Sequence, residues 1–274
     1  MLSPPGKPTQ EILNAFGTSE EPVLLTGGQG INYRAGNMVF KPVADSSGAS
    51  WEADIYSKII TNDKFRVPRP IRAKDGSWVF NGWTAYEFIS GKHIPGKYAE
   101  SIAISREFHK ALAVFPKPDD FDKGTNVWSI ADKMAWGDIP FHDFELSNKP
   151  LKNIFSLIKE NKLPSQLMHG DWGPGNILFD DKLPPAVIDF SPYWRPADFA
   201  IAVMMLDAIA WEGANESIFD LGKDVADFQQ LLLRGIVRRT CEYIGHQLHP
   251  ENTKDRTDGI IKYLSLLDLV MKIK

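Results

Sequence analysis

Cysteine is nearly absent from the sequence. The one cysteine among the 274 residues, Cys241, has no partner for an internal disulfide. Its surroundings also lack the Cys-x-x-Cys spacing or the adjacent histidine that would suggest a metal site. We therefore expect no disulfide framework and interpret Cys241 as a packed thiol.

Long hydrophobic runs are lacking as well. The longest apolar run, residues 199–206, stops at Asp207 and is far below the roughly 18 residues that a membrane-spanning helix requires. Residues 1–10 contain prolines, a glycine and a lysine, but no apolar core of the kind that a secretory signal needs. The sequence therefore predicts a cytoplasmic protein without a membrane partner.

Basic runs, internal repeats and low-complexity tracts are also missing. The net charge of −4 gives no electrostatic reason to expect binding to nucleic acid or to an anionic membrane. A composition of 43% hydrophobic and 24% charged residues is that of an ordinary globular protein. A chain of 274 residues is long enough for one large domain or two modest ones, and its size favours two lobes.

Two polar side chains mark the stretch of residues 167–179, which reads as strand, loop and strand. Asp171 and Asn176 are separated by glycines and a proline, so a tight loop would point both into one cleft. A second carboxylate, Asp189, ends the apolar run that begins at residue 185. Phosphoryl transfer uses these groups in this order: one Asp orients the attacking hydroxyl and accepts its proton, while Asn and the second Asp hold Mg²⁺.

The order His169-Gly170-Asp171, then Asn176, then Ile188-Asp189-Phe190 matches His-Gly-Asp-x-x-x-x-Asn followed by Ile-Asp-[Phe/Trp]. The chain therefore resembles the aminoglycoside phosphotransferase family, the small-molecule kinases that include choline kinase-like enzymes and are related in fold to protein kinases. The resemblance implies an α+β, protein-kinase-like fold of two lobes. A small β-rich lobe, residues 1–90, would bind nucleotide, and a larger helical lobe, residues 91–274, would carry catalysis and acceptor binding. It also implies that Asp171 is catalytic and that Asn176 and Asp189 are the metal ligands.

Glycine turns separate three expected short strands within residues 22–41. Gly27, Gly28 and Gly30 form the first turn, and Gly36 opens the second. Glycines in the first turn would let the backbone approach a phosphate and offer N–H groups to it. A hairpin turn that needs positive φ would use the same residues, so that explanation stays open.

Lys41 ends the third of these strands and resembles the strand-three lysine of kinases. Apolar residues at a helical spacing predict a helix over residues 50–60. The resemblance makes Glu52 the partner that orients Lys41 toward the α- and β-phosphates, with Asp54 as the competing candidate. An exposed acid in a first helical turn, favoured by the helix dipole, is an equally open interpretation of Glu52.

A hairpin is expected around Asn81-Gly82, which is a strong turn signal. In the family, the strand that follows runs into the linker between the lobes, and adenine hydrogen-bonds to its backbone. This resemblance assigns the nucleotide-binding hinge to Glu87 and Ile89. Residues 90–96 break both helix and strand patterns, which suits a lobe boundary.

Several charged residues have structural interpretations. We interpret His109, on an expected helix, as a satisfied core residue. For His169 the resemblance implies a structural role, as a brace for the backbone of the metal-binding segment. Asp198 is either a plain acid at a helix start or, by the resemblance, the acid that hydrogen-bonds the catalytic-loop backbone. The pair Arg238-Arg239 is interpreted as part of a solvated helix face.

The acceptor site is the least specified part of the sequence. Trp172 and Trp194 adjoin the catalytic and metal motifs in expected loops, and either could offer a flat face to a sugar ring or a cationic amine. Asp207 and Glu212 would supply nearby negative charge. Core packing is the interpretation for three other tryptophans of the second lobe, Trp128, Trp136 and Trp211. The acceptor is therefore expected to be hydroxylated and sugar-like or amino-sugar-like.

Two rival functions follow from the same motifs. Only eight residues separate Asp189 from Asp198, and no Ala-Pro-Glu is present, which leaves no room for the activation segment of a protein kinase. A catalytically inactive nucleotide-binding scaffold would have lost part of the machinery, yet Lys41, Asp171, Asn176 and Asp189 are all present. The resemblance thus implies transfer of the γ-phosphate of ATP or GTP to a small-molecule hydroxyl, with a sugar, amino sugar or aminoglycoside as acceptor. The scaffold stays as the alternative.

Overall fold

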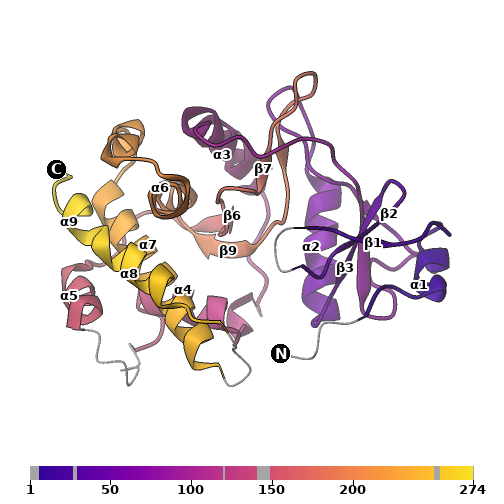
Figure 1. Cartoon of the computed structure of the whole chain (residues 1–274), viewed down its shortest axis with the longest axis horizontal. Coiled ribbons are helices and arrows are strands. Elements are labelled where there is room, and N and C mark those ends of the chain that lie inside the picture. Colours follow the sequence, from indigo (N-terminus) through magenta and orange to yellow (C-terminus); the bar gives the residue numbers. More distant parts are fainter. Residues whose placement is uncertain (1–5, 27–29, 120, 141–148, 250–253, 274) are drawn as a thin grey trace. The chain divides into compact units, whose positions relative to one another are not determined.

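The chain divides into two compact units in the computed structural model, which describes residues 6–26, 30–119, 121–140, 149–249 and 254–273. The first unit comprises Met1–His93 together with Ile177–Phe190, and the second comprises Ile94–Asn176 and Ser191–Lys274 (Figure 1). A single boundary after residue 90 therefore does not describe the division, because the segment around Asp189 groups with the first unit. The roles assigned to the two lobes stay predictions.

The first unit is built on a five-stranded sheet in the order β1-β2-β3-β5-β4, with all neighbours antiparallel. Its strands are β1 (Val23–Leu24), β2 (Tyr33–Ala35), β3 (Met38–Pro42), β4 (Pro70–Ile71) and β5 (Trp83–Glu87). The three strands expected in residues 22–41 are present. The turn expected at Asn81-Gly82 is present too, with φ of +46° and +76°. The residues before this turn do not form a strand, since Phe80 makes only one bridge, to Trp83. The strand that pairs with β5 on that side is β4.

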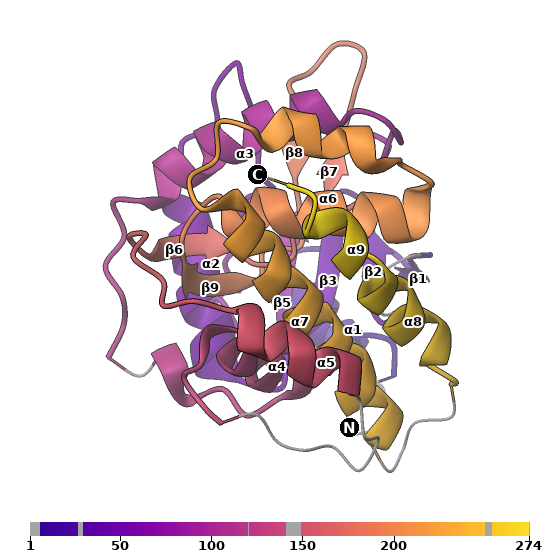
Figure 2. The same cartoon turned by 90° about the vertical axis from the view of Figure 1, so that its left-hand side faces the viewer.

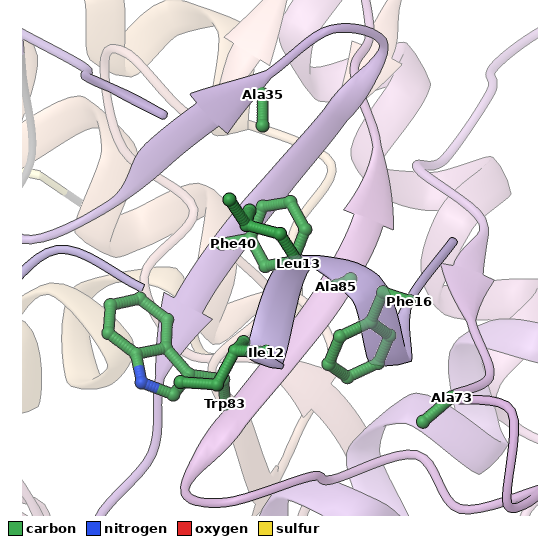
Figure 3. Packing of buried hydrophobic residues seen from close by; sticks show 8 residues of the cluster. All are labelled: Ile12, Leu13, Phe16, Ala35, Phe40, Ala73, Trp83 and Ala85. Atoms are coloured by element: carbon green, nitrogen blue, oxygen red, sulfur yellow. The ribbon is translucent and has the colours of Figure 1, made fainter. Parts of the chain in front are cut away.

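Helices cover both faces of this sheet. Helix α1 (Gln10–Ala15) buries an apolar cluster against one face, shown in Figure 3: Ile12, Leu13, Phe16, Ala35, Phe40, Ala73, Trp83 and Ala85. Residues of β5 alternate between faces, and on the other face Tyr86 packs edge-on against Tyr56 of α2 (Ser46–Lys58), with ring centroids 6.2 Å apart. Helix α2 begins earlier than expected because Asp45 caps it by accepting from the Ser47 N–H at 3.0 Å.

A small antiparallel pair, β7 (Ile177–Leu178) and β8 (Ala186–Val187), belongs to the first unit. It is attached by a bridge between Lys92 and Phe179. Gly91 precedes this bridge with φ of +133°, and a Cβ there would lie 2.9 Å from the Leu178 Cβ. A side chain at position 91 is therefore disfavoured both by conformation and by contact.

The second unit is mainly helical. Its α-helices are α3 (Tyr98–Leu112), α4 (Val127–Trp136), α5 (Lys149–Leu157), α6 (Phe199–Glu212), α7 (Phe228–Leu248), α8 (Thr257–Ser265) and α9 (Leu267–Val270). The described residues of this unit also form the 3₁₀ segments η1 (Phe121–Lys123) and η2 (Glu216–Gly222) and the strand pair β6 (Gln166–His169) with β9 (Pro192–Arg195). Helix α7 is the centre of the bundle, because α4, α5, α6, α8 and α9 all contact it (Figure 2).

Helices α6 and α7 approach each other closely. The first ten residues of α6, 199–208, are all buried, as expected for a helix that is apolar on every face. Gly235 allows the approach, since a Cβ there would lie 2.6 Å from the Leu206 Cδ1 atom. Gly235 lies inside α7, which follows η2 as one continuous helix. A glycine that marks close packing therefore does not interrupt the helix.

The α+β organisation expected from the sequence is confirmed, with a sheet-rich first unit and a helical second unit. Cys241 is buried, and burial raises the pKa of its thiol to about 12, in agreement with a packed thiol. None of the helices in the described ranges combines the length and the hydrophobicity needed to cross a bilayer.

Candidate active site

The loop between β6 and β7 folds tightly on itself. The Gly173 N–H donates to the Asp171 carbonyl at 2.8 Å, and Gly175 has a φ of +96°, which favours glycine. These turns bring Asn176 back to Asp171: its Nδ2 donates to the Asp171 carbonyl at 2.8 Å and to Oδ2 of the carboxylate at 3.2 Å. The structure thus places the two side chains together, as the spacing predicted.

Gly170 lies where no side chain fits. A Cβ at this position would be 1.9 Å from Cδ2 of Tyr193 on β9. The Gly170 N–H donates to the Ser191 carbonyl at 2.8 Å, and its own carbonyl accepts from Nη1 of Arg238 at 2.6 Å. The glycine between His169 and Asp171 is therefore required by the packing of the loop against β9.

Two buried histidines support this loop. His169 accepts through Nδ1 from the Asp171 N–H at 3.2 Å and, more weakly, from the Ser191 N–H at 3.5 Å. His109 donates through Nδ1 to the Ser105 carbonyl at 2.7 Å and accepts through Nε2 from the His169 N–H at 3.0 Å. Burial lowers the pKa of His109 to about 3, so it is neutral. Both histidines are structural residues, in agreement with their interpretation from the sequence.

The Asp171 carboxylate carries charge and remains accessible. Burial alone would raise its pKa, but Nη2 of Arg239, 2.8 Å from Oδ1, outweighs burial and holds the pKa well below the ordinary value. Asp171 is therefore ionised at neutral pH. Its side chain is 43% exposed, so a ligand can reach it.

The interpretation of Arg238-Arg239 as a solvated face is wrong. Their side chains are 1% and 11% exposed. Nε of Arg239 donates to Oδ1 of Asp207 at 3.1 Å, and its Nη1 donates to Glu242 at 2.9 Å. Nε of Arg238 donates to the other Glu242 oxygen at 2.9 Å. Both arginines belong to the site, because one holds Asp171 and the other holds the Gly170 carbonyl.

In the first unit, Lys41 forms its ion pair with Asp189 and not with Glu52. Asp54, the competing candidate, pairs with Lys58 at 2.6 Å. The expected Lys41–Glu52 pair is thus not formed, nor is Glu52 a freely exposed acid. Burial raises the pKa of Glu52 to about 7, with Lys41 opposing the rise and Asp189 adding to it. Asp189 has a φ of +53°, an uncommon conformation for a residue with a side chain.

The glycine turn is described only in part. Gly27 and Gly28 lie outside the described residues, while Gly30 has a φ of +66° and space around its Cα. At the expected hinge, the Glu87 N–H donates to the Arg69 carbonyl and the Phe88 N–H to the Asn37 carbonyl, both at 2.8 Å. Within the described ranges, the Ile89 N–H has no backbone partner.

Two of the candidate acceptor residues are unsuited to contact a ligand. Trp172 has 0% exposure, and its Nε1 donates to the Ser101 hydroxyl at 3.2 Å, so it is a core residue. Asp207 is also buried, and its Oδ1 accepts from the Tyr263 hydroxyl at 2.7 Å. Trp194 is only half-buried, but it lies on β9 and not in a loop, with its ring packed edge-on against Phe121.

Glu212 and Asp198 lie at the two ends of α6. Glu212, its last residue, accepts a hydrogen bond from the Tyr98 hydroxyl, which raises the pKa of Tyr98 together with burial and the Glu212 charge. Asp198 precedes the helix, and no hydrogen bond joins its side chain to the catalytic loop within the described residues. Arg238 makes the contact to the Gly170 carbonyl instead. Trp211, expected in the core, is 44% exposed and stacks on Tyr243 at an interplanar angle of 14°.

A cavity of about 700 Å³ lies elsewhere in the second unit. Its lining comes from the end of α4, the segment after it, α5 and the buried Arg234. It contains none of the residues predicted for catalysis, metal binding or acceptor binding. This cavity and the cluster of charged groups around Asp171 are therefore separate features, and the chemistry favours the charged cluster.

Comparison with known proteins identifies the relatives of this chain. A family model described as "Phosphotransferase enzyme family" matches residues 38–231. No curated protein matches the chain. A solved amicoumacin kinase in complex with AMP-PNP and Ca²⁺ is 12% identical, with a TM-score of 0.62, and the alignment covers 92% of this chain and 88% of that one.

Two further solved structures support the same fold. The GDP complex of an aminoglycoside 2′-phosphotransferase is 18% identical, with a TM-score of 0.56 and coverage of 92% of this chain and 93% of that one. A choline/ethanolamine kinase family protein from Mesorhizobium loti is 14% identical, with a TM-score of 0.56 and coverage of 94% and 90%. The protein-kinase-like fold expected from the motifs is confirmed, and so is the resemblance to small-molecule kinases.

Proposed function

Because the chain belongs to the phosphotransferase enzyme family, we propose that it transfers the γ-phosphate of ATP or GTP to a hydroxyl group of a small molecule. The observation that carries this proposal is the state of Asp171. Its carboxylate is ionised, fixed by donors from Asn176 and Arg239, and still accessible from solvent. A fixed, accessible carboxylate suits a group that orients an attacking hydroxyl and accepts its proton.

The nucleotide is assigned to residues of the first unit. Lys41 would contact the phosphates, and the backbone of Glu87 and Ile89 would bind the base. The Ile89 N–H suits this role because the neighbouring Phe88 N–H is already donated to the Asn37 carbonyl. Gly27, Gly28 and Gly30 stay predictions for the phosphate turn. Glu52 is close enough to Lys41 for their charges to interact, and it would orient the lysine once it is ionised.

The chemistry of the proposed metal ligands fits Mg²⁺. Nδ2 of Asn176 is donated to Asp171, and within the described residues no donor reaches the amide oxygen, which leaves that oxygen for a cation. Asp189 contributes a carboxylate, whose present partner is the Lys41 ammonium group. Mg²⁺ in nucleotide sites takes one or two protein oxygens and completes its shell with phosphates and water. When bound, the ion would neutralise charge on the transferred phosphoryl group.

The acceptor is proposed to be a hydroxylated small molecule such as a sugar, an amino sugar or an aminoglycoside. The solved relatives include an amicoumacin kinase and an aminoglycoside 2′-phosphotransferase. Half-buried Trp194 and Glu212 remain candidates for contact with it, and exposed Trp211 joins them. Trp172 and Asp207 do not, because both are buried. A cytoplasmic location stays a prediction.

Transfer of labelled phosphate from [γ-³²P]ATP or [γ-³²P]GTP with Mg²⁺ to a library of hydroxylated compounds tests this proposal. We expect Asp171→Asn to lower kcat by about 10²-fold or more, the usual contribution of a general base. The KM for nucleotide should stay close to wild type, since Asp171 acts on the hydroxyl. A variant with near-normal kcat would show that Asp171 is not the base. Nucleotide binding without transfer to any acceptor or to water would favour the scaffold.

A further inference from the structure

The Asp171 carboxylate is held from two sides by side chains of the second unit. Nη2 of Arg239 donates to Oδ1 at 2.8 Å, and Nδ2 of Asn176 approaches Oδ2 at 3.2 Å. Donors on both oxygens fix the rotation of the carboxylate about its Cβ–Cγ bond. We propose that Arg239 is a positioning residue for phosphoryl transfer, which fixes the direction in which Asp171 presents its free lone pairs to the acceptor hydroxyl. This inference rests on the function proposed above.

Arg239 is itself fixed by three further hydrogen bonds. Its Nε and Nη2 atoms donate to the two oxygens of Asp207, and Nη1 donates to Glu242. Asp207 is held in turn by the Tyr263 hydroxyl at 2.7 Å. A planar guanidinium that meets one carboxylate with two donors has a defined orientation. The Nη2 atom that contacts Asp171 is therefore placed by α6, α7 and α8 together.

Asp171 is the accessible member of this charged cluster. Arg239 forms ion pairs with Asp171, Asp207 and Glu242, and Arg238 forms one with Glu242. The side chains of Asp207 and Glu242 are 7% and 5% exposed, whereas that of Asp171 is 43% exposed. Asp171 is therefore the carboxylate of the cluster that a ligand can reach, and Arg239 orients it without covering it.

A role in positioning predicts which kinetic constant changes. The Asp171 carboxylate acts on the acceptor, so its misplacement should slow transfer and leave nucleotide binding unaffected. A displacement of about 1 Å at a reacting group can cost on the order of 10²-fold in rate. A purely structural arginine would instead lower stability and leave the turnover of the folded fraction unchanged.

Helix α7 offers a matched control. Arg234, one turn before Arg238, is also a buried arginine, and it donates to two backbone carbonyls, those of Ala135 and Lys159. It has no contact with Asp171, Asp207 or Glu242. Removal of Arg234 therefore removes a buried guanidinium from the same helix without touching the catalytic carboxylate.

The experiment compares Arg239→Ala, Arg239→Lys and Arg234→Ala, with Asp171→Asn in the same series. Release of labelled phosphate from Mg²⁺-ATP is measured, with water as the common acceptor and with any hydroxyl compound that the library yields. We expect Arg239→Ala to lower kcat by about 10²-fold with the KM for ATP within about twofold of wild type. The kcat of Arg239→Lys should lie between those of wild type and Arg239→Ala, since lysine keeps the positive charge but lacks the planar set of guanidinium donors. Millimolar guanidinium should restore part of the turnover of Arg239→Ala. It should not restore turnover that is lost in Arg234→Ala.

The outcomes separate the two levels of the proposal. If Asp171→Asn abolishes turnover while Arg239→Ala retains it, the catalytic assignment stands and the positioning role is wrong. If kcat falls equally in Arg239→Ala and Arg234→Ala, in proportion to the folded fraction measured by circular dichroism, Arg239 is a structural residue only. If wild type has no turnover with water or with any library compound, the proposed function fails and this inference fails with it. If Arg239→Ala does not fold, Arg239→Lys tests the proposal. A lysine variant with wild-type kcat would show that the guanidinium group does not position Asp171.

Discussion

A neutral histidine packs beside the loop that carries Asp171. His109 is buried, donates through Nδ1 to Ser105 and accepts through Nε2 from His169. Protonation of Nε2 would turn this acceptor into a donor that faces the His169 N–H. Burial lowers the pKa of His109 from 6.5 to about 3, so the folded state binds fewer protons than the unfolded state below about pH 6.5. Stability linked to His109 is therefore complete above that pH and is lost as the pH falls.

We expect the free energy of unfolding to decrease below pH 6.5 by up to about 1.4 kcal/mol per pH unit through His109. Urea unfolding at several pH values between 6.5 and 4.5 measures this slope. In His109→Gln the slope should be smaller, because the titrating group is gone. Glu52, whose pKa is raised to about 7, acts in the opposite sense over this interval in both proteins, so the difference between the two slopes reports His109. Equal slopes in the two proteins would show that His109 does not control the acid sensitivity.

At the scale of single residues, sequence spacing predicted the local geometry and missed the long-range contacts. Asp171 and Asn176 are close because the glycines and the proline between them permit one tight loop, which is a property of the segment itself. Arg239 meets Asp171 across 68 positions of the chain, and no local pattern encodes such a contact. A usable signal was present, however: residues 231–237 are apolar around Arg234, and charges in a helix that is apolar on every face tend to be buried and paired.

Strands β6 and β9 hold the loop that carries Asp171. Tyr193 of β9 lies against the backbone of Gly170, and the Arg238 guanidinium lies over the Tyr193 ring at 4.3 Å from its centroid. The same Arg238 donates to the Gly170 carbonyl. The loop backbone, the aromatic ring and the guanidinium therefore form one packed stack. The site depends on this stack, because Asp171 follows Gly170 directly.

Gly170→Ala should destabilise the fold by about 1–3 kcal/mol, the usual cost of overpacking, because its Cβ would overlap Tyr193. In a Tyr193→Ala background the same change should cost much less, so the two substitutions should show a coupling of about 1–3 kcal/mol in urea unfolding. Gly175→Ala, in the same loop, is the control: its Cβ meets no atom within 4 Å, and the cost there comes from the φ of +96°. Tyr193→Ala should leave that cost unchanged. An additive result for Gly170 would contradict the packing argument.

At the scale of elements, periodicity predicted the long helices better than the short strands. The helix predicted from apolar spacing over residues 50–60 is present within α2, and the helix on which His109 was expected is α3. The strands β4, β7 and β8 have two residues each, which is too short for an alternating pattern to show. They exist because neighbouring backbone offers pairing partners, and these partners are set by the tertiary fold.

At the scale of the whole molecule, the proposed groups fall into two sets. Lys41 and Asp189 belong to the first unit, and Asp171 and Asn176 belong to the second. The chain crosses between the units directly after Asn176 and directly after Phe190. The two proposed metal ligands therefore belong to different units, Asn176 to the second and Asp189 to the first, although the two residues are close in sequence. Asp189 is therefore the proposed metal ligand that belongs to the same unit as Lys41.

A non-hydrolysable nucleotide with Mg²⁺ should raise the midpoint of thermal unfolding, because a ligand that binds only the folded state stabilises it. At a free ligand concentration of 100 times Kd, the expected stabilisation is about 2.7 kcal/mol, which corresponds to several degrees for a chain of this size. Differential scanning calorimetry with AMP-PNP, with and without Mg²⁺, measures it. Asp189→Ala should lose the Mg²⁺-dependent part of the shift, because a carboxylate ligand is gone. Asp54→Ala is the control, since Asp54 pairs with Lys58 at the surface and should keep the full shift. A shift that is the same with and without Mg²⁺ in the wild type, or one that survives in Asp189→Ala, would remove Asp189 from the metal site and leave its ion pair with Lys41 as its role.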